Sequence, residues 1–152
     1  TIGKALAEKL GKTFVDLDEE IVRRAGKSIP DIFAQEGEAA FRRLETEAAA
    51  EAAKHTGQVI SCGGGIVKTP GNARLLRQNG PVLWIRRPLE ALTVGGGRPL
   101  SSSREALEKM EAERLPLYRA AADGIVENSG SLEQAITAAE EVFYEILDSE
   151  RA

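Results

Sequence analysis

Two carboxylate residues near the start of this 152-residue sequence are spaced so that their side chains could take part in one reaction. Asp16 and Asp18 lie in a short β-prone segment, residues 14–18. Alternate side chains of a strand share one face, so these carboxylates should point the same way, about 7 Å apart, and could hold a metal ion and a substrate hydroxyl. Alternatively, Asp18 only complements the positive end of the helix predicted to follow. Taken alone, the pair favours this second interpretation.

Two arginines are candidates for binding an anion. Arg42 lies in a predicted helix, residues 38–54, where it could form a surface ion pair with Glu38. It could instead turn inward, held by Glu45, because a planar guanidinium matches the geometry of a carboxylate. Arg114 lies at the predicted end of another helix, where compensation of the helix dipole is the simpler interpretation.

The sequence contains two runs of three glycines, residues 63–65 and 95–97. Residues 63–65 follow a predicted buried strand. Successive glycines lose much conformational entropy on folding, so such a run is expected where the backbone must lie flat against another group. One glycine would suffice for a tight turn, so this run favours the close approach of a ligand. Residues 95–97 precede Arg98 and predict either a surface loop or a hinge that brings Arg98 onto a phosphate.

The composition narrows the class of protein. Apolar residues make up 42% and charged residues 29% of the chain, which argues against a disordered or fibrous protein. A net charge of −4 and 5% aromatic residues argue against nucleic acid as a partner. No apolar run approaches the roughly 20 residues of a membrane span, and we expect no membrane partner and a cytoplasmic location. One cysteine, Cys62, and one histidine argue against a structural zinc site.

Short apolar segments alternate with helical patterns along the chain. The predicted strands are residues 14–18, 59–62, 81–85 and 125–126. The predicted helices are residues 2–10, 19–25, 28–36, 38–54, 69–79, 88–94, 102–114 and 131–146. Strands that are apolar on both faces and separated by helices predict an α/β fold, in which a parallel sheet forms the middle of three layers with helices on both faces. Ligands of such sheets bind at the carboxyl ends of the strands.

Taken together, the order and spacing of these motifs resemble the shikimate kinases, P-loop kinases of the nucleoside-monophosphate-kinase type. As a set the motifs are specific, and they span nearly the whole chain. The residues that carry the resemblance are Phe14-Val15-Asp16-Leu17-Asp18, Ser28-Ile29-Pro30 with Ile32-Phe33, Phe41-Arg42-Arg43-Leu44-Glu45, Gly63-Gly64-Gly65, Arg98-Pro99-Leu100, and Arg114 before Pro116-Leu117-Tyr118.

The resemblance implies transfer of the γ-phosphoryl group of ATP to the 3-hydroxyl of shikimate, a step towards aromatic amino acids. It implies that Asp18 binds and activates this hydroxyl. Arg42 and Arg114 would grip the shikimate carboxylate, with Glu45 bracing Arg42. The remaining residues that it places in the substrate pocket are Phe33, Phe41, Gly63, Gly64 and Gly65.

The resemblance also implies ATP and Mg²⁺ as cofactors. Asp16 corresponds to the carboxylate near Mg²⁺, and Arg98, on a lid at about residues 92–104, to the catalytic arginine that meets the phosphates of ATP. The family's phosphate-binding loop, G-x-x-x-x-G-K-S/T, and the strand before it precede a helix like residues 2–10. Thr1 resembles the residue just after the Lys-Ser pair of that loop and would lie at the nucleotide. We therefore expect residues 1–152 to be one kinase domain, N-terminally incomplete, without its first central strand and inactive alone.

Two other functions stay open. One is a non-catalytic module that keeps the pocket for shikimate and has lost phosphate chemistry. The other is a related small-molecule kinase, for example of gluconate, because a pair of arginines indicates a carboxylate without specifying which one. The expected partners are shikimate and ATP, and the expected state is a monomer or part of a fused pathway enzyme.

Overall fold

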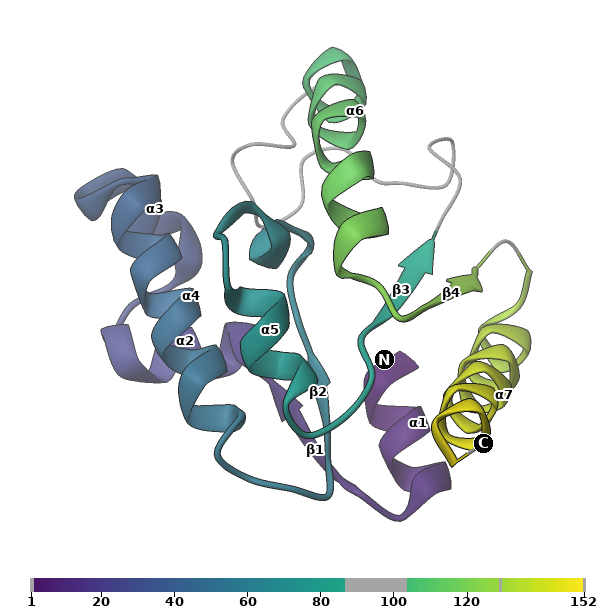
Figure 1. Ribbon diagram of the computed structural model, residues 1–152. Coiled ribbons are helices and arrows are strands. Elements are labelled where there is room, and N and C mark those ends of the chain that lie inside the picture. Colours follow the sequence, from purple (N-terminus) through teal and green to yellow (C-terminus); the bar gives the residue numbers. More distant parts are fainter. Residues whose placement is uncertain (1, 87–103, 129, 152) are drawn as a thin grey trace.

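The computed structural model describes residues 2–86, 104–128 and 130–151. Within these ranges helices and short strands alternate, as the sequence predicts (Figure 1). In chain order the elements are α1 (Ile2–Leu10), β1 (Thr13–Asp16), α2 (Leu17–Ala25), α3 (Ile29–Glu36), α4 (Glu38–Ala52), β2 (Gln58–Ser61), the 3-10 helix η1 (Gly64–Lys68), α5 (Asn72–Arg77), β3 (Leu83–Arg86), α6 (Arg104–Ala121), β4 (Gly124–Glu127) and α7 (Leu132–Arg151).

The described strands form two parallel pairs. β1 runs beside β2 with Asp16 opposite Ser61, and β3 runs beside β4 with Leu83 opposite Gly124. The two pairs share no hydrogen bonds between strands in the described ranges, so the one continuous sheet that the sequence predicts is not observed there. The α/β class with parallel strands is confirmed. A further central strand stays a prediction.

Helices cover both faces of the β1–β2 pair because successive side chains of a strand point to opposite faces. Ile60 packs against a buried cluster centred on α2, α3 and α4, which includes Leu17 and Phe41. Its neighbour Val59 packs against a second cluster, formed with α1, β4 and α7 around Val126. Figure 1 shows α2, α3 and α4 grouped on one side of the strands, while α1 lies beside α7 on the other. The β1–β2 pair and the helices on its two faces therefore form three layers.

Local capping signals in the sequence determine several helix ends. The Ser28 hydroxyl accepts a hydrogen bond from the Asp31 amide at the start of α3. Ser131 and Gln134 exchange hydrogen bonds at the start of α7, which is the capping box that their spacing predicts. Gly26 ends α2 with a φ of 70°, a left-handed conformation that glycine adopts without steric cost.

The predicted strand over residues 14–18 is too long. β1 ends at Asp16, whose carboxylate accepts a hydrogen bond from the Asp18 amide at 2.9 Å and so caps α2. Asp18 therefore lies in the first turn of a helix, and the expectation that alternation along a strand aligns Asp16 with Asp18 is wrong. A side-chain cap competed with the strand pattern and ended it.

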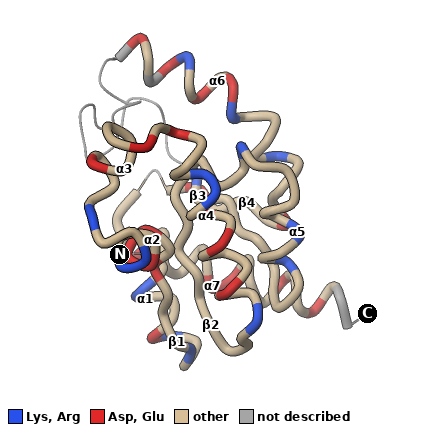
Figure 2. The backbone as a smooth tube through the Cα atoms, turned by 90° about the vertical axis from the view of Figure 1, so that its left-hand side faces the viewer, with Lys and Arg blue, Asp and Glu red and all other residues tan. Residues whose placement is uncertain are grey.

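The predicted end of a helix at Arg114 is also wrong. α6 continues through Pro116 to Ala121, so Arg114 lies inside the helix and cannot compensate the dipole at its end. Proline removes one backbone donor from a helix, and packing can outweigh this cost. Acidic and basic residues are interspersed along α6 (Figure 2), yet Arg114 is buried.

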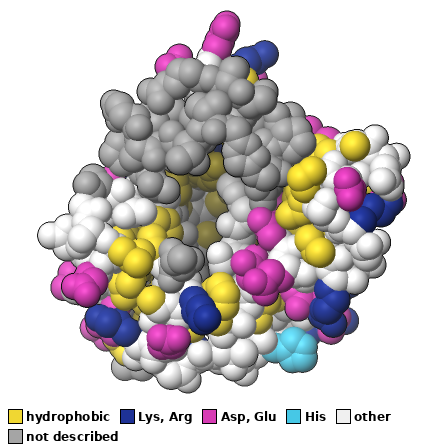
Figure 3. All heavy atoms as spheres, turned by 180° about the vertical axis from the view of Figure 1, so that it is seen from behind, with side chains coloured by type: hydrophobic (Ala, Val, Ile, Leu, Met, Phe, Trp, Pro, Cys, Tyr) yellow, Lys and Arg dark blue, Asp and Glu magenta, His cyan; other side chains and the backbone are white. Residues whose placement is uncertain are grey.

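Several sequence predictions fall outside the described residues. They are Thr1, the helix at residues 88–94, the second glycine run, Arg98, the first two residues of the helix at residues 102–114 and all but the last residue of the lid expected at about residues 92–104. Among the helices that are described, none combines the length and apolar character needed to cross a bilayer. On the back of the molecule, apolar side chains reach the surface beside a central hollow, and charged side chains of both signs lie below it and to its right (Figure 3).

Candidate active site

The first glycine run forms a turn at the carboxyl end of β2. The strand ends at Ser61, opposite Asp16 of β1, and Gly63 then leads into η1 in an extended conformation. The turn and the start of α2 consequently lie at the same edge of a parallel pair, where the sequence predicts a ligand site. We call residues 63–65 the glycine turn.

Arg42 of α4 lies directly against the glycine turn. A Cβ atom added to Gly65 would stand 2.7 Å from the guanidinium carbon of Arg42, closer than real contacts of this kind allow. Gly65 is also buried. The absence of a side chain at this position is therefore what lets the guanidinium group approach the backbone so closely.

Carboxylates on its own helix hold the guanidinium of Arg42. Nε and Nη2 donate to Glu38 at 3.2 and 3.1 Å, and Nη1 donates to the buried Glu45 at 3.1 Å. A guanidinium has five N–H groups, so these bonds leave one on each terminal nitrogen with no partner among the described residues. Two parallel N–H groups match the two oxygens of a carboxylate.

An ion pair links η1 back to the same arginine. Lys68, the last residue of η1, donates to Glu38 at 2.8 Å. The hydrogen bond from Lys68 is the largest influence on Glu38 and, together with Arg42, holds the pKa of its carboxyl below the usual value. Sequence reasoning missed Lys68 because the pair joins residues 30 apart, and no local pattern indicates such a contact.

The aromatic residues of the predicted pocket pack beside Arg42. The rings of Phe33 and Phe41 are 4.9 Å apart between centroids. The guanidinium carbon of Arg42 lies 5.1 Å from the centroid of Phe41, within the range of a cation–π contact. Phe33 therefore packs against Phe41, which is fully buried and in turn contacts Arg42.

Arg114 approaches the glycine turn from α6. A Cβ atom on Gly64 would lie 3.2 Å from Nη1 of Arg114 and 2.8 Å from the hydroxyl of Tyr118, one turn further along the helix. Arg114 is 7% exposed, and its buried Nε has no hydrogen-bond partner in the described parts of the chain. None of the ion pairs found there involves Arg114. A buried cation is costly without a counter-charge, and an anionic ligand is one group that would supply it.

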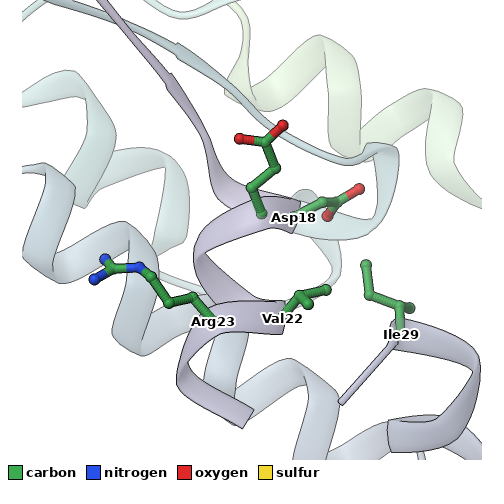
Figure 4. A pocket seen from close by; sticks show the side chains of 5 residues that line it. Asp18, Val22, Arg23 and Ile29 are labelled. Carbon is green, nitrogen blue, oxygen red and sulfur yellow. The ribbon is translucent and has the colours of Figure 1, made fainter. Parts of the chain in front are cut away.

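Asp18 lines an open hollow between α2 and α3. Figure 4 shows Val22 and Ile29 pointing toward one another across this hollow, while Arg23 leaves α2 on the other side. The two apolar side chains form a wall beside the Asp18 carboxylate. A polar hydroxyl and an apolar ring face could both be accommodated there.

Cys62 connects the acidic residues to the glycine turn. Burial first, and then the charges of Glu45, Asp18 and Asp16, raise the pKa of its thiol to about 12. These three carboxylates therefore act on the residue that immediately precedes Gly63. At such a pKa the thiol stays protonated at neutral pH and is a poor nucleophile.

The structure thus brings together most of the residues predicted for the site. Arg42 and Arg114 converge on neighbouring glycines, and Asp16 and Asp18 act on the residue before the same turn. Across the residues whose placement is described, no three His, Cys, Asp or Glu side chains gather as a metal site, so Asp16 as a ligand near Mg²⁺ stays a prediction. Thr1 and Arg98 are not described.

Comparison with solved structures defines the class of protein. Shikimate kinase from Acinetobacter baumannii, solved in complex with shikimate, superposes with a TM-score of 0.87 at 33% identity, covering 97% of this chain and 86% of that chain. Shikimate kinase from Aquifex aeolicus vf5 gives a TM-score of 0.81 at 29% identity, covering 99% and 89%. The fold is that of the α/β P-loop kinases.

Sequence comparison identifies the family. Shikimate kinase from Stenotrophomonas maltophilia (strain K279a) is 45% identical over 129 residues, which are 80% of this chain and 72% of the relative. Shikimate kinase from Bordetella avium (strain 197N) is 40% identical over 134 residues, 84% of this chain and 64% of the relative. The chain therefore spans about two thirds of the length of these relatives. The family model "SKI: Shikimate kinase" matches residues 1–149, and the chain belongs to the shikimate kinase family.

Proposed function

We propose that this protein transfers the γ-phosphoryl group of ATP to the 3-hydroxyl of shikimate, giving shikimate 3-phosphate. Membership of the family supports this reaction and ATP as its donor. The observation that carries the proposal is the convergence of two arginines, the partly buried Arg42 and the buried Arg114, on Gly65 and Gly64. Such a pair suits a small carboxylic acid.

The two arginines bind the acid in different ways. Arg42 offers the carboxylate its two remaining N–H groups, one from each terminal nitrogen, in an orientation held by Glu38 and Glu45. Arg114 supplies the charge that Arg42, already beside two carboxylates, cannot supply in full. Its Nε, which has no hydrogen-bond partner among the described residues, is the proposed donor to the bound acid.

Asp18 is the proposed acceptor of the hydroxyl proton. The positive end of α2 favours negative charge at this position, so the carboxylate can orient the 3-hydroxyl and accept its proton as the phosphoryl group arrives. Phosphoryl transfer depends mainly on positioning and on neutralisation of charge. A site of fixed arginines and one carboxylate, without a nucleophile–base pair, suits that chemistry.

Arg98 and Thr1 are the residues proposed to contact ATP, and Asp16 to lie near Mg²⁺. Mg²⁺ usually retains several waters and needs only one or two carboxylates besides the phosphates, so the lack of a three-ligand cluster in the described ranges is no obstacle. Asp16 uses Oδ1 to cap α2, which leaves its other oxygen for a metal-bound water. When bound, Mg²⁺ would neutralise charge on the phosphates.

The test of the proposal is phosphate transfer from ATP to shikimate by the full-length gene product, with Mg²⁺ present or chelated. Asp18→Asn should lower kcat by at least about 100-fold, within the range of general-base catalysis, while the far-ultraviolet spectrum stays unchanged. Glu20→Gln is the matched control, because it removes a carboxylate of the same turn that pairs with Arg23 on the surface. A near-normal rate of Asp18→Asn would remove Asp18 from the mechanism.

Calorimetry separates the remaining functions. Shikimate binding without any turnover would identify a non-catalytic binding module, and turnover of gluconate but not shikimate would identify a different small-molecule kinase. The cytoplasmic location and the monomeric or fused state expected from the sequence stay predictions.

A further inference from the structure

The side chain of Asn72 is buried at 1% exposure and makes hydrogen bonds in two directions. Its amide nitrogen donates to the carbonyl oxygen of Ile66 at 3.0 Å. Its amide oxygen accepts from the hydroxyl of Thr46 at 2.9 Å. Asn72 is the first residue of α5, so one side chain joins α5, η1 and α4.

This link lies beside the contact between Arg42 and the glycine turn. Ile66 directly follows Gly65, on which the guanidinium group lies. Thr46 is four residues after Arg42 in α4, which places it one turn further along the same face of the helix. The hydrogen-bonded path from Ile66 through Asn72 to Thr46 therefore connects the same two segments as the Arg42–Gly65 contact.

We propose that Asn72 and Thr46 are positioning residues for Arg42, which set the distance between α4 and η1 and so aim its two remaining N–H groups into the acid-binding site. The inference rests on the proposed function. Because a single Cβ atom would not fit between Gly65 and Arg42, the spacing of the two segments has little tolerance. A shift of η1 relative to α4 therefore changes the distance between Gly65 and the Arg42 guanidinium group.

The exposed ion pair between the same segments is a weaker constraint. Lys68 and Glu38 are each 37% exposed, and solvent and salt screen such pairs. The Asn72 amide is out of reach of water, so loss of either partner leaves a buried polar group unsatisfied. The buried link should therefore determine the position of η1 more strongly than the ion pair.

The test measures steady-state kinetics and shikimate affinity of the full-length gene product. Thr46→Val keeps the volume of the side chain and removes the hydroxyl, so we expect the KM and Kd for shikimate to rise about tenfold, the loss that one buried hydrogen bond produces. The KM for ATP and kcat should change less than about twofold, since only ground-state binding of the acid is affected. Thr46→Ser retains the hydroxyl and should restore the affinity.

A second variant and a stability control make the result specific. Asn72→Asp keeps the oxygen that accepts from Thr46 and loses the donor to Ile66, so it should raise the KM for shikimate in the same way and serves if Thr46→Val does not fold. Val126→Ala shortens a buried side chain in the other core cluster. It should lower the melting temperature without changing the KM for shikimate.

The outcomes separate the inference from the proposed function. An unchanged KM for shikimate in both Thr46→Val and Asn72→Asp, with only a lower melting temperature as in Val126→Ala, would make the link merely structural and overturn the inference alone. A wild-type protein that neither binds nor phosphorylates shikimate would overturn the proposed function and this inference with it.

Discussion

Two neighbouring residues of the glycine turn, Gly65 and Gly64, contact arginines that are held in opposite ways. At Gly65, Arg42 is surrounded by charge from its own helix, since Glu38 and Glu45 together accept three of its hydrogen bonds. At Gly64, Arg114 is buried beside Tyr118 with its Nε unpartnered among the described residues. One arginine is oriented before any ligand arrives, and we propose that the other gains its counter-charge from the ligand. On this proposal, geometry and charge for acid binding come from different helices.

The largest expected effect comes from removing the space that Arg42 uses. In Gly65→Ala the new Cβ would stand 2.7 Å from the guanidinium carbon. We expect shikimate affinity to fall by about 100-fold, because overpacking of a rigid contact costs about 2–3 kcal/mol. Isothermal titration of the full-length gene product with shikimate measures this loss.

Gly64→Ala and a distant glycine calibrate the same measurement. A Cβ on Gly64 would stand 2.8 Å from the Tyr118 hydroxyl, a milder overlap than the one at Gly65, so the loss should be about tenfold at most. Gly80→Ala is the control, because no heavy atom lies within 4 Å of its added Cβ. Equal losses in the Gly64 and Gly65 variants would contradict the difference between the two arginine contacts.

A pair of methionine substitutions should separate the two arginines by the sign of their effect on stability. Arg42→Met takes a partner from the buried Glu45, and breaking a buried pair costs about 3 kcal/mol. Arg114→Met removes a buried charge that has no ion-pair partner in the described residues, so its free energy of unfolding should rise by about 1 kcal/mol. Both variants should lose affinity for shikimate.

Urea unfolding measures these opposite shifts. Arg119→Met, on the exposed side of α6, serves as the reference for replacing an arginine of that helix. A destabilised Arg114→Met variant would mean that Arg114 already has a favourable partner in the free protein. The contrast between the arginine contacts at Gly64 and Gly65 would then disappear.

Local sequence signals predict several helix ends and the ion pair that holds one of the arginines, Arg42. The capping residues Ser28 and Ser131 could be read from the sequence because their partners lie three residues away. The Arg42–Glu45 brace is local in the same way, with a separation of three. The end of β1 was misplaced because Asp16 serves as both the last strand residue and the helix cap.

Contacts between distant segments could not be predicted. Lys68 reaches Glu38 across 30 residues and Thr46 reaches Asn72 across 26, and the composition of neither segment indicates its partner. The glycine run predicts a close approach, but only the packing of α4 and α6 assigns Arg42 to Gly65 and Arg114 to Gly64. The helix through Pro116 likewise depends on tertiary packing that overrides the local signal.

The smallest effect concerns Glu38, the exposed brace of Arg42. Its pKa is lowered in the folded protein, first by Lys68, so its ionised form contributes stability at neutral pH and loses that contribution as the pH falls below its ordinary value of 4.5. Glu38→Gln should be less stable than wild type at pH 7 by about 0.5 kcal/mol, since the pair is partly exposed. At pH 3 the difference should be close to zero.

Urea unfolding of wild type, Glu38→Gln, Lys68→Met and the double variant at both pH values measures this coupling. Because Lys68 is the main cause of the shift, the pH-dependent loss caused by Glu38→Gln should mostly vanish when the substitution is made in a protein that already carries Lys68→Met. If the loss persists in full without Lys68, Arg42 alone accounts for the interaction that stabilises the ionised Glu38 carboxylate. In that case the Gly65 end of the turn would be held entirely from within α4, and η1 would depend on the buried Asn72 link for its position.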